Sequence, residues 1–273
     1  MRPRLVVLGL HALLLAAAAL TLLPLLWMLA VSFMSPGEAS AFPPPFLPAH
    51  PTLGNYQQLF ARQNVARYLA NSLWLALLTT ACSLLFNSLA GYAFAKLRFR
   101  GREPLLRLLL AALVIPSQVA MLPLFLLMKW LGLVNSYAAV VIPGMAGIFG
   151  LFLVRQYTLA IPDELLEAAR IDGAGELRIF FSIVLPALTP ILVTLGVFTF
   201  LGSWNDFMWP LIVLSDQQLY TLPIALAALS REHVPDNELM MAGAVLTVLP
   251  VLVLFLSLQR YYIRGILMGS VKG

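Results

Sequence analysis

The stretch DELLEAARIDGAGELRIFFSIVLP, residues 163–186, interrupts the apolar character of the chain. It holds five acidic residues and two arginines, whereas only 11% of the whole chain is charged. Apolar runs precede and follow it, so these charges stand together between two candidate membrane segments. We name residues 162–186 the elbow segment and predict that it protrudes from an otherwise apolar protein.

The overall composition predicts a membrane protein. Of the 273 residues, 61% are hydrophobic, and a soluble domain usually carries about 25% charged residues. The net charge of +5 does not indicate nucleic-acid binding, because the basic residues stand in short blocks between apolar runs, as topology signals do. The single cysteine, Cys82, excludes an internal disulfide and a cysteine-based metal cluster.

Six segments have about the length that a helix needs to cross a bilayer, roughly 20 apolar residues. They are Leu5–Phe33, Tyr68–Phe94, Leu105–Met128, Tyr137–Val154, Ile183–Met208 and Leu239–Tyr262. The first follows two arginines, as a signal peptide does, and Ala39-Ser40-Ala41 resembles a cleavage site. Its apolar run exceeds the roughly 7–15 residues of a signal peptide, so we expect a retained helix.

The distribution of lysine and arginine predicts that both termini lie in the cytoplasm. With that orientation, 13 of the 17 basic residues fall on the inner side. The predicted parts are a first transmembrane helix in 1–34, an extracytoplasmic loop in 35–67, five transmembrane helices in 68–262 with a cytoplasmic loop at 155–186, and a cytoplasmic tail in 263–273. In the first loop, FPPPFLP cannot form a regular helix, whereas TLGNYQQLFARQN can form a short surface helix.

Local signals predict a helix, a turn and a second helix in the elbow segment. Pro162 suits the start of a helix, and Asp163 and Glu164 lie near its positive end. Gly173 is a natural stop, and a second helical stretch runs from Glu176 to Pro186. The small Ala168 and Ala169 allow close seating against another protein, but the charge pattern also fits a solvated connecting loop, and these signals leave both interpretations open.

A longer pattern resembles a known family. Glu167-Ala168-Ala169, then Gly173, then Ile183 and Leu185-Pro186 resemble the EAA signature of ATP-binding-cassette (ABC) importer permeases. The form EAARIDGAG is similar to the carbohydrate-uptake branch, in particular to maltose permease G-type subunits. The stretches NYQQLF, GYAFAKLRFRG, FLVRQY, WNDFMWPL and YYIRGILMGSVKG extend the resemblance over nearly the whole chain.

The resemblance implies an all-α membrane protein with six transmembrane helices and the type I ABC importer permease fold. The helix that carries Glu167 would be the coupling helix, seated in a cleft of a separate cytoplasmic ATPase. The residues that couple it to the ATPase would be Glu167, Ala168, Ala169, Asp172 and Gly173. The implied partners are a second homologous permease, an ABC ATPase dimer, an extracytoplasmic solute-binding protein, the sugar and the lipid bilayer. ATP and Mg²⁺ would bind the ATPase, because this chain has no G-x-x-x-x-G-K-[ST] phosphate loop. We therefore expect a non-enzymatic subunit of the prokaryotic inner membrane, without its own cofactor or metal.

The candidate pathway residues stand near the end of the fifth span. Asp206 is an acid within an apolar segment, and ionisable groups there cost roughly 2.5–3.5 kcal/mol. With Trp204, Asn205 and Trp209 it fits a sugar pathway or gate, or equally an interfacial aromatic belt. For the other polar residues of the spans, Asn71, Asn87, Gln118 and Asn135, we expect interhelical hydrogen bonds. We expect kinks in spans three and five at Pro116, Pro186 and Pro190.

Two further segments have roles only by resemblance. The outer loop with Arg231, Glu232, His233 and Asp236 would contact the solute-binding protein; otherwise it is a plain exposed loop. The terminal MGSVKG would insert between the ATPase subunits, or it is a frayed end.

Rival functions lack residues that their chemistry needs. An intramembrane protease needs a second aspartate or a histidine beside a serine, and a haem carrier needs paired histidines on facing helices. A secondary transporter has ion-coupling charges near the membrane midplane, and this chain has none there. The remaining alternative is an ABC permease for a non-sugar solute such as a peptide, phosphate or glycerol phosphate.

Overall fold

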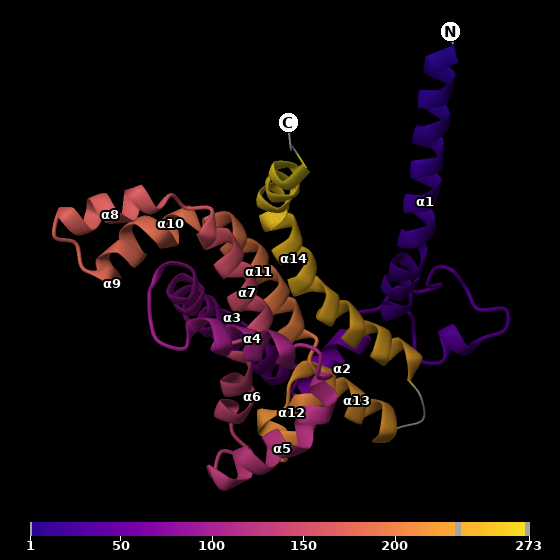
Figure 1. Cartoon of the computed structure of the whole chain (residues 1–273). Coiled ribbons are helices and arrows are strands. Elements are labelled where there is room, and N and C mark those ends of the chain that lie inside the picture. Colours follow the sequence, from indigo (N-terminus) through magenta and orange to yellow (C-terminus); the bar gives the residue numbers. More distant parts are fainter. Residues whose placement is uncertain (1, 233–235, 271–273) are drawn as a thin grey trace. The chain divides into compact units, whose positions relative to one another are not determined.

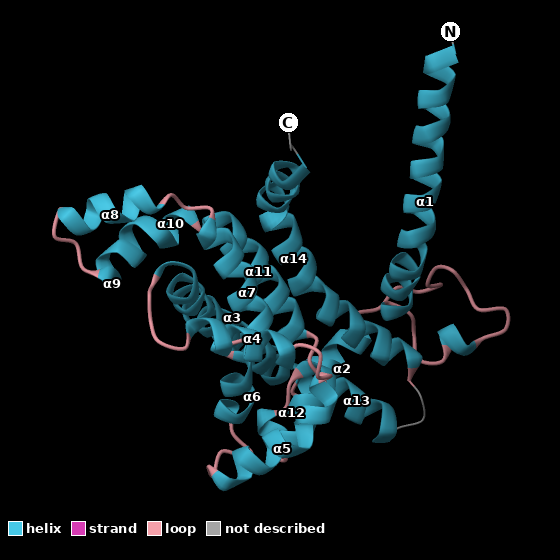
Figure 2. Ribbon diagram, viewed as in Figure 1, coloured by secondary structure: helices cyan, strands magenta, loops and turns pink. Residues whose placement is uncertain are grey.

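The computed structural model describes residues 2–232 and 236–270, and in these ranges the chain forms helices and loops without a strand (Figures 1 and 2). It divides into two compact units. Unit 1 comprises Met1–Arg67 with Ala225–Val251, and unit 2 comprises Tyr68–Ile224 with Leu252–Gly273. Three helices pass from one unit into the other: α3 (Val65–Lys96), α13 (Leu222–Glu232) and α14 (Asn237–Ser270).

The remaining elements belong to one unit each. Unit 1 contains α1 (Arg2–Ser32), the short turn η1 (Glu38–Ser40) and α2 (Gly54–Arg62). Unit 2 contains α4 (Arg102–Ala112), α5 (Ser117–Trp130), α6 (Tyr137–Gly144), α7 (Ile148–Leu159), α8 (Asp163–Ile171), α9 (Glu176–Ile179), the π-helical turn η2 (Phe180–Val184), α10 (Leu185–Ala187), α11 (Thr189–Trp204), α12 (Met208–Val213) and η3 (Gln217–Leu219).

Four of the predicted spans are long apolar helical segments, and two are broken. Val6–Ser32, Val65–Lys96, Tyr137–Leu159 and Asn237–Gln259 are long and apolar enough to cross a membrane. The predicted third span is α4 and α5, bent by 109°, and the fifth is the α9–α10 segment and α11, bent by 79°. The first break ends at Pro116, whose extended backbone (ψ 134°) cannot continue a helix. Proline therefore marks the bends as predicted, but these bends exceed simple kinks.

The first loop of unit 1 is folded onto the end of α1. The side chain of Asn55 on α2 is buried, and its amide donates to the carbonyls of Ser32 at 3.0 Å and Met34 at 2.9 Å. These bonds satisfy carbonyl groups that the end of α1 leaves without helical partners. As predicted, α2 is a short helix and the proline-rich residues 42–48 are not helical.

A buried carboxylate joins the same loop to the start of α14. Glu238 is 1% exposed, and its Oε1 accepts a hydrogen bond from the backbone N–H of Ala39 at 2.7 Å. No role for Glu238 was expected from the sequence.

In unit 2, α3 and α7 cross at a glycine. A Cβ atom on Gly91 would lie 2.6 Å from Cγ1 of Val154 and 2.9 Å from the backbone N of Arg155. Only glycine allows the two backbones to come this close. The crossing lies beside an apolar cluster in which Tyr92, Leu166, Ile179 and Phe180 are buried, so α3, α7 and the elbow segment share one core.

Candidate functional site

The elbow segment has the predicted helix–turn–helix form (Figure 1). Helix α8 begins directly after Pro162, whose backbone is extended. Gly173 adopts a left-handed backbone (φ 82°), and the next N–H, from Ala174, donates to the carbonyl of Ala169 at 3.0 Å. This closes the end of α8 as a glycine-based cap does. Helix α8 is the first arm of the elbow segment, and the second arm, from α9 to α10, begins at Glu176.

The two arms bury one apolar face and present the other outward. Leu166 of α8 is 1% exposed and packs in the cluster that holds Ile179 and Phe180. The signature residues Glu167, Ala168 and Asp172 are exposed, and Ala169 is half-buried. Large apolar side chains are exposed beside them, with Ile171 at 87%. The outward face of α8 is thus both acidic and apolar.

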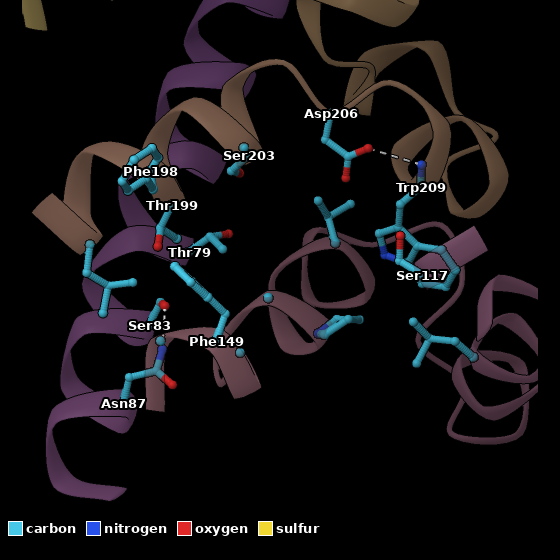
Figure 3. Close-up of a pocket in the computed structure, with 18 of the residues that line it drawn as sticks. Thr79, Ser83, Asn87, Ser117, Phe149, Phe198, Thr199, Ser203, Asp206 and Trp209 are labelled. Atoms are coloured by element: carbon cyan, nitrogen blue, oxygen red, sulfur yellow. Dashed lines mark hydrogen bonds between the residues drawn. The ribbon is translucent and has the colours of Figure 1, made fainter. Parts of the chain in front are cut away.

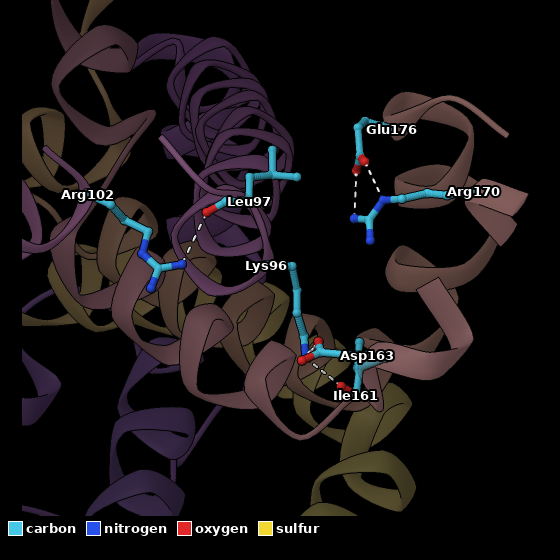
Figure 4. Close-up of polar contacts among 7 residues, drawn as sticks. All are labelled: Lys96, Leu97, Arg102, Ile161, Asp163, Arg170 and Glu176. Atoms are coloured by element: carbon cyan, nitrogen blue, oxygen red, sulfur yellow. Dashed lines mark hydrogen bonds and ion pairs between the residues drawn. The ribbon is translucent and has the colours of Figure 1, made fainter. Parts of the chain in front are cut away.

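Charged residues fasten the elbow segment to the end of α3 (Figure 4). Lys96 on α3 donates to Oδ1 of Asp163 at 2.7 Å and to the carbonyl of Ile161 at 2.6 Å. Hydrogen bonding and the positive charge of Lys96 lower the pKa of Asp163 below its usual value. Within the elbow segment, Arg170 pairs with Glu176 at 2.7 Å.

A tyrosine on α3 completes this connection. The hydroxyl of Tyr92 donates to the carboxylate of Glu176, and its ring contacts that of Phe180 at a centroid distance of 5.7 Å. Tyr92 and Lys96 lie one helical turn apart, so they hold both arms of the elbow segment to the same end of α3.

A cavity of about 610 Å³ opens in unit 2 along the middle of α3 (Figure 3). It is lined by Thr79, Ser83, Asn87, Ser117, Ala120, Met121, Leu124, Val140, Pro143, Gly144, Gly147, Phe149, Gly150, Leu195, Phe198, Thr199, Gly202, Ser203, Asp206 and Trp209. Its volume lies within the roughly 300–1,000 Å³ typical of small-molecule sites.

The polar lining is ordered by helix geometry. Thr79, Ser83 and Asn87 follow one another at four-residue spacing on α3 and therefore share one face, which we name the polar stripe. All three are at most 5% exposed, and the Asn87 amide donates to the Ser83 hydroxyl at 2.8 Å. Thr199 and Ser203 show the same spacing on α11.

The predicted pathway residues divide between the cavity and the surrounding core. Asp206 and Trp209 line the cavity, and Oδ1 of Asp206 accepts from the backbone N–H of Trp209 at 3.3 Å (Figure 3). Trp204 is 1% exposed and stacks on Phe200, and Asn205 is exposed and donates to its own helix. The structure therefore does not bring Trp204 and Asn205 into the cavity lining.

The predicted binding-protein contact residues lie around the connection from α13 to α14. Asp236 caps α14, because its Oδ1 accepts from the N–H of Leu239 at 2.9 Å. Arg231 and Glu232 end α13, and the structure does not describe their side chains. His233 lies outside the described residues, as does the end of the predicted C-terminal tail, residues 271–273.

Sequence reasoning missed the polar stripe and the role of Tyr92. Asn87 was expected to bond between helices, but its amide bonds within α3. The four-residue spacing of Thr79, Ser83 and Asn87 in an apolar helix was a usable signal. Asn71 confirms the interhelical expectation, since its Oδ1 accepts from the hydroxyl of Tyr137 on α6 at 2.7 Å. Its amide donates to the carbonyls of Gln218 and Tyr220, both at 2.9 Å.

No group of three or more His, Cys, Asp or Glu residues in the described ranges could hold a metal ion.

Comparisons with known proteins agree on one family. Residues 87–268 match the family model described as "Binding-protein-dependent transport system inner membrane component". The chain is 42% identical over 229 residues to the arabinooligosaccharides transport system permease protein AraQ of Halalkalibacterium halodurans, which covers 84% of this chain and 82% of that protein. It is 35% identical over 256 residues to the lactose transport system permease protein LacG of Rhizobium radiobacter, covering 94% and 93%.

A solved structure shares the fold. The chain matches a chain of a bacterial ABC transporter involved in the import of the acidic polysaccharide alginate, with a TM-score of 0.84. The match covers 95% of this chain and 97% of that chain at 24% sequence identity, so it shows a shared fold only.

Proposed function

This chain belongs to the family of binding-protein-dependent transport system inner membrane components, and on that premise we propose that it is the permease subunit of an ATP-driven importer that brings a carbohydrate into the cytoplasm. It is a multi-pass membrane protein with the type I ABC importer permease fold. The printed names of similar permeases support a sugar: arabinooligosaccharides, lactose and galactooligosaccharides. These names favour a sugar over a peptide, phosphate or glycerol phosphate.

We propose that the elbow segment docks onto a separate ATPase. The outward face of α8 carries Glu167 beside exposed apolar groups such as Ile171, a combination that suits a protein partner better than water. Glu167 would meet a basic residue there, Ala168 and Ala169 would allow close approach, and Gly173 and Asp172 would shape the turn. ATP and Mg²⁺ belong to the ATPase dimer in this proposal.

The observation that carries the proposal is that a single helix, α3, contacts the elbow segment and also lines the cavity. Helix α3 holds the elbow segment at its end through Tyr92 and Lys96, and in its middle it lines the cavity with the polar stripe. A helix is stiff along its axis, so a pull on the elbow segment would move the stripe as well. Closure of the ATPase dimer would in this way change access to the cavity.

The other partners and the orientation are part of the same proposal. The apolar window of α1 is 0% buried within the chain, and Leu15 and Leu20 are 71% and 73% exposed, which suits lipid and a second permease. The lysine and arginine distribution favours a cytoplasmic position for both termini and an outer position for residues 35–67. In this orientation, residues 35–67 and the segment around Asp236 would meet a solute-binding protein.

The test is to co-express the chain with the second permease and ATPase, purify the complex and reconstitute it in liposomes with the binding protein. We expect the ATPase to co-purify, and radiolabelled lactose or an arabinooligosaccharide to accumulate only with ATP and binding protein. Uptake of phosphate or a peptide instead of every sugar would contradict the substrate class. Absence of any co-purifying ATPase would contradict the assembly.

A further inference from the structure

We infer that this subunit binds the transported carbohydrate directly, in the cavity between the polar stripe on α3, the hydroxyls of α11 and Asp206. The inference rests on the proposed function and adds to it a binding site within this chain. The cavity offers unused hydrogen-bonding groups, a single type of charge and apolar surfaces.

Two hydroxyls that line the cavity, on Thr199 and Ser203, are not used by the described part of the protein. Elsewhere in the long helices, hydroxyls donate back to their own helix: Thr80 to Ala76 at 2.6 Å, Thr158 to Val154 at 2.8 Å and Thr194 to Pro190 at 3.2 Å. Such internal bonds are the usual way to satisfy a hydroxyl in a membrane helix.

The cavity hydroxyls depart from this pattern. Thr199 and Ser203 are half-buried and line the cavity, and neither side chain forms a hydrogen bond with the described residues. The Thr79 oxygen also has no partner in the described part of the chain, but it is almost fully enclosed, so a solute in the cavity would not reach it. A ligand rich in hydroxyl groups would supply partners for Thr199 and Ser203.

The charge of the cavity lining is negative. Asp206 is the charged residue among the lining residues, and no lysine or arginine of the described chain pairs with it. A carboxylate that has no cationic partner accepts hydrogen bonds from hydroxyl groups, and in its ionised form it repels an anion. The cavity therefore suits a neutral polyhydroxylated solute and disfavours phosphate or glycerol phosphate.

Aromatic side chains form part of the cavity lining. Phe149, Phe198 and Trp209 line the cavity together with the polar groups. A sugar ring has apolar C–H faces and a polar rim, so it requires both kinds of surface at once. Gly202 also lines the cavity, and a Cβ atom there would meet nothing within 4 Å, so the space beside it is open.

The decisive experiment compares two threonines of α11 in the reconstituted complex. Thr199→Val removes a hydroxyl that lines the cavity without a partner among the described residues, whereas Thr194→Val removes a hydroxyl that bonds to the carbonyl of Pro190 on its own helix. With radiolabelled lactose or arabinooligosaccharide at saturating binding protein, we expect uptake by Thr199→Val to fall about fivefold, the worth of one hydrogen bond of roughly 1 kcal/mol. Uptake by Thr194→Val should stay within about twofold of wild type.

Two further variants identify the occupant. Gly202→Leu should block uptake while the assembled complex still hydrolyses ATP, and Gly196→Ala on the same helix, whose Cβ would make only ordinary contacts from 3.5 Å, should not. In a Cys82→Ser background, Ser203→Cys should react with a small methanethiosulfonate, and the transported sugar should slow that reaction.

The outcomes separate this inference from the proposed function. If the wild-type complex transports no sugar, the proposed function fails. If it transports sugar but Thr199→Val behaves as Thr194→Val does and the sugar gives no protection of Ser203→Cys, only the inference fails. If Gly202→Leu loses the second permease during purification, a helix of that partner fills the cavity and the inference is overturned.

Discussion

The elbow segment and the cavity belong to the same unit, but they are specified in opposite ways. The elbow segment is one continuous stretch whose helix starts, turn and buried face all follow from neighbouring residues. The cavity is assembled from residues between Thr79 and Trp209 on several separate helices. The difference teaches that a segment formed by neighbouring residues, which we propose docks onto a partner protein, can be recognised in the sequence. The cavity, which we propose holds the solute, depends on how distant helices pack.

The largest expected effect is on the outward face of α8. In the reconstituted complex, Glu167→Arg should reduce sugar uptake and its ATPase stimulation by about tenfold or more, because a reversed charge would face a basic partner surface. Glu164→Arg reverses another exposed charge of the same helix and is the control. Unchanged uptake by Glu167→Arg, or equal losses in both variants, would show that α8 does not act through Glu167.

The next effect concerns packing behind the cavity. Gly91→Ala should destabilise the protein by about 2–3 kcal/mol, because the added Cβ would lie 2.6 Å from Val154 and 2.9 Å from the backbone of Arg155. Gly196→Ala, with its nearest contact at 3.5 Å, should be neutral or stabilising. Thermal unfolding of the purified complex measures both. Equal stability of the two variants would mean that the α3–α7 crossing is not close-packed.

The turn of the elbow segment offers a matched pair of glycines. Neither Gly173 nor Gly175 has an atom within 4 Å of an added Cβ, but only Gly173 has a left-handed backbone, with φ 82°. Gly173→Ala should therefore cost about 1–2 kcal/mol through backbone strain alone. Gly175→Ala should change stability by less than about 0.5 kcal/mol. The same unfolding assay separates them, and a larger loss for Gly175→Ala would contradict the local specification of the turn.

A smaller effect is expected where α3 meets the elbow segment. Tyr92→Phe removes the hydrogen bond to Glu176 and keeps the buried ring, so stability should fall by about 1 kcal/mol. If α3 transmits motion, less sugar should also move per ATP hydrolysed. Tyr157→Phe changes an exposed tyrosine and is the control. If Tyr92→Phe moves as much sugar per ATP hydrolysed as wild type, α3 does not transmit the motion of the elbow segment through Tyr92.

The smallest effect is a dependence on pH. Lys96 lowers the pKa of Asp163 below the ordinary 3.8, chiefly through their hydrogen bond. A lowered folded-state pKa gives stability that is present above the unfolded value and is lost as the pH falls through the folded value. Between about pH 5 and 3, wild type should thus lose slightly more thermal stability than Lys96→Met. Identical pH profiles would indicate that the pair is not formed in the complex.

Several parts of the fold could be predicted because their signals are local. The helix after Pro162, the stop at Gly173, the short helix in 54–62 and the bends near Pro116 and Pro190 all depend on residues within one turn of the feature. The size of the bends was not predicted, because a proline shows where a helix breaks and tertiary packing determines the angle.

The site was only half predicted for the same reason. Asp206 stood out as an acid in an apolar segment, and it lines the cavity. Its neighbours Trp204 and Asn205 were grouped with it, but helix geometry turns them elsewhere, into the core and toward the surface. Thr79 was not recognised, because a threonine in a membrane helix is ordinarily satisfied by its own helix, and only the structure shows that this one is not.

By itself the sequence determined that this protein lies in a lipid bilayer, how many apolar segments it has and the form of the elbow segment. Hydrophobicity, proline, glycine and helix-end charges determine these features because they act over a few residues. The tertiary structure alone decided that Tyr92 and Lys96 hold the elbow segment and that the polar stripe faces a cavity. Those facts depend on which helices cross and how closely. Such crossings are set by side-chain packing between residues far apart in the chain, at positions such as Gly91 and Val154.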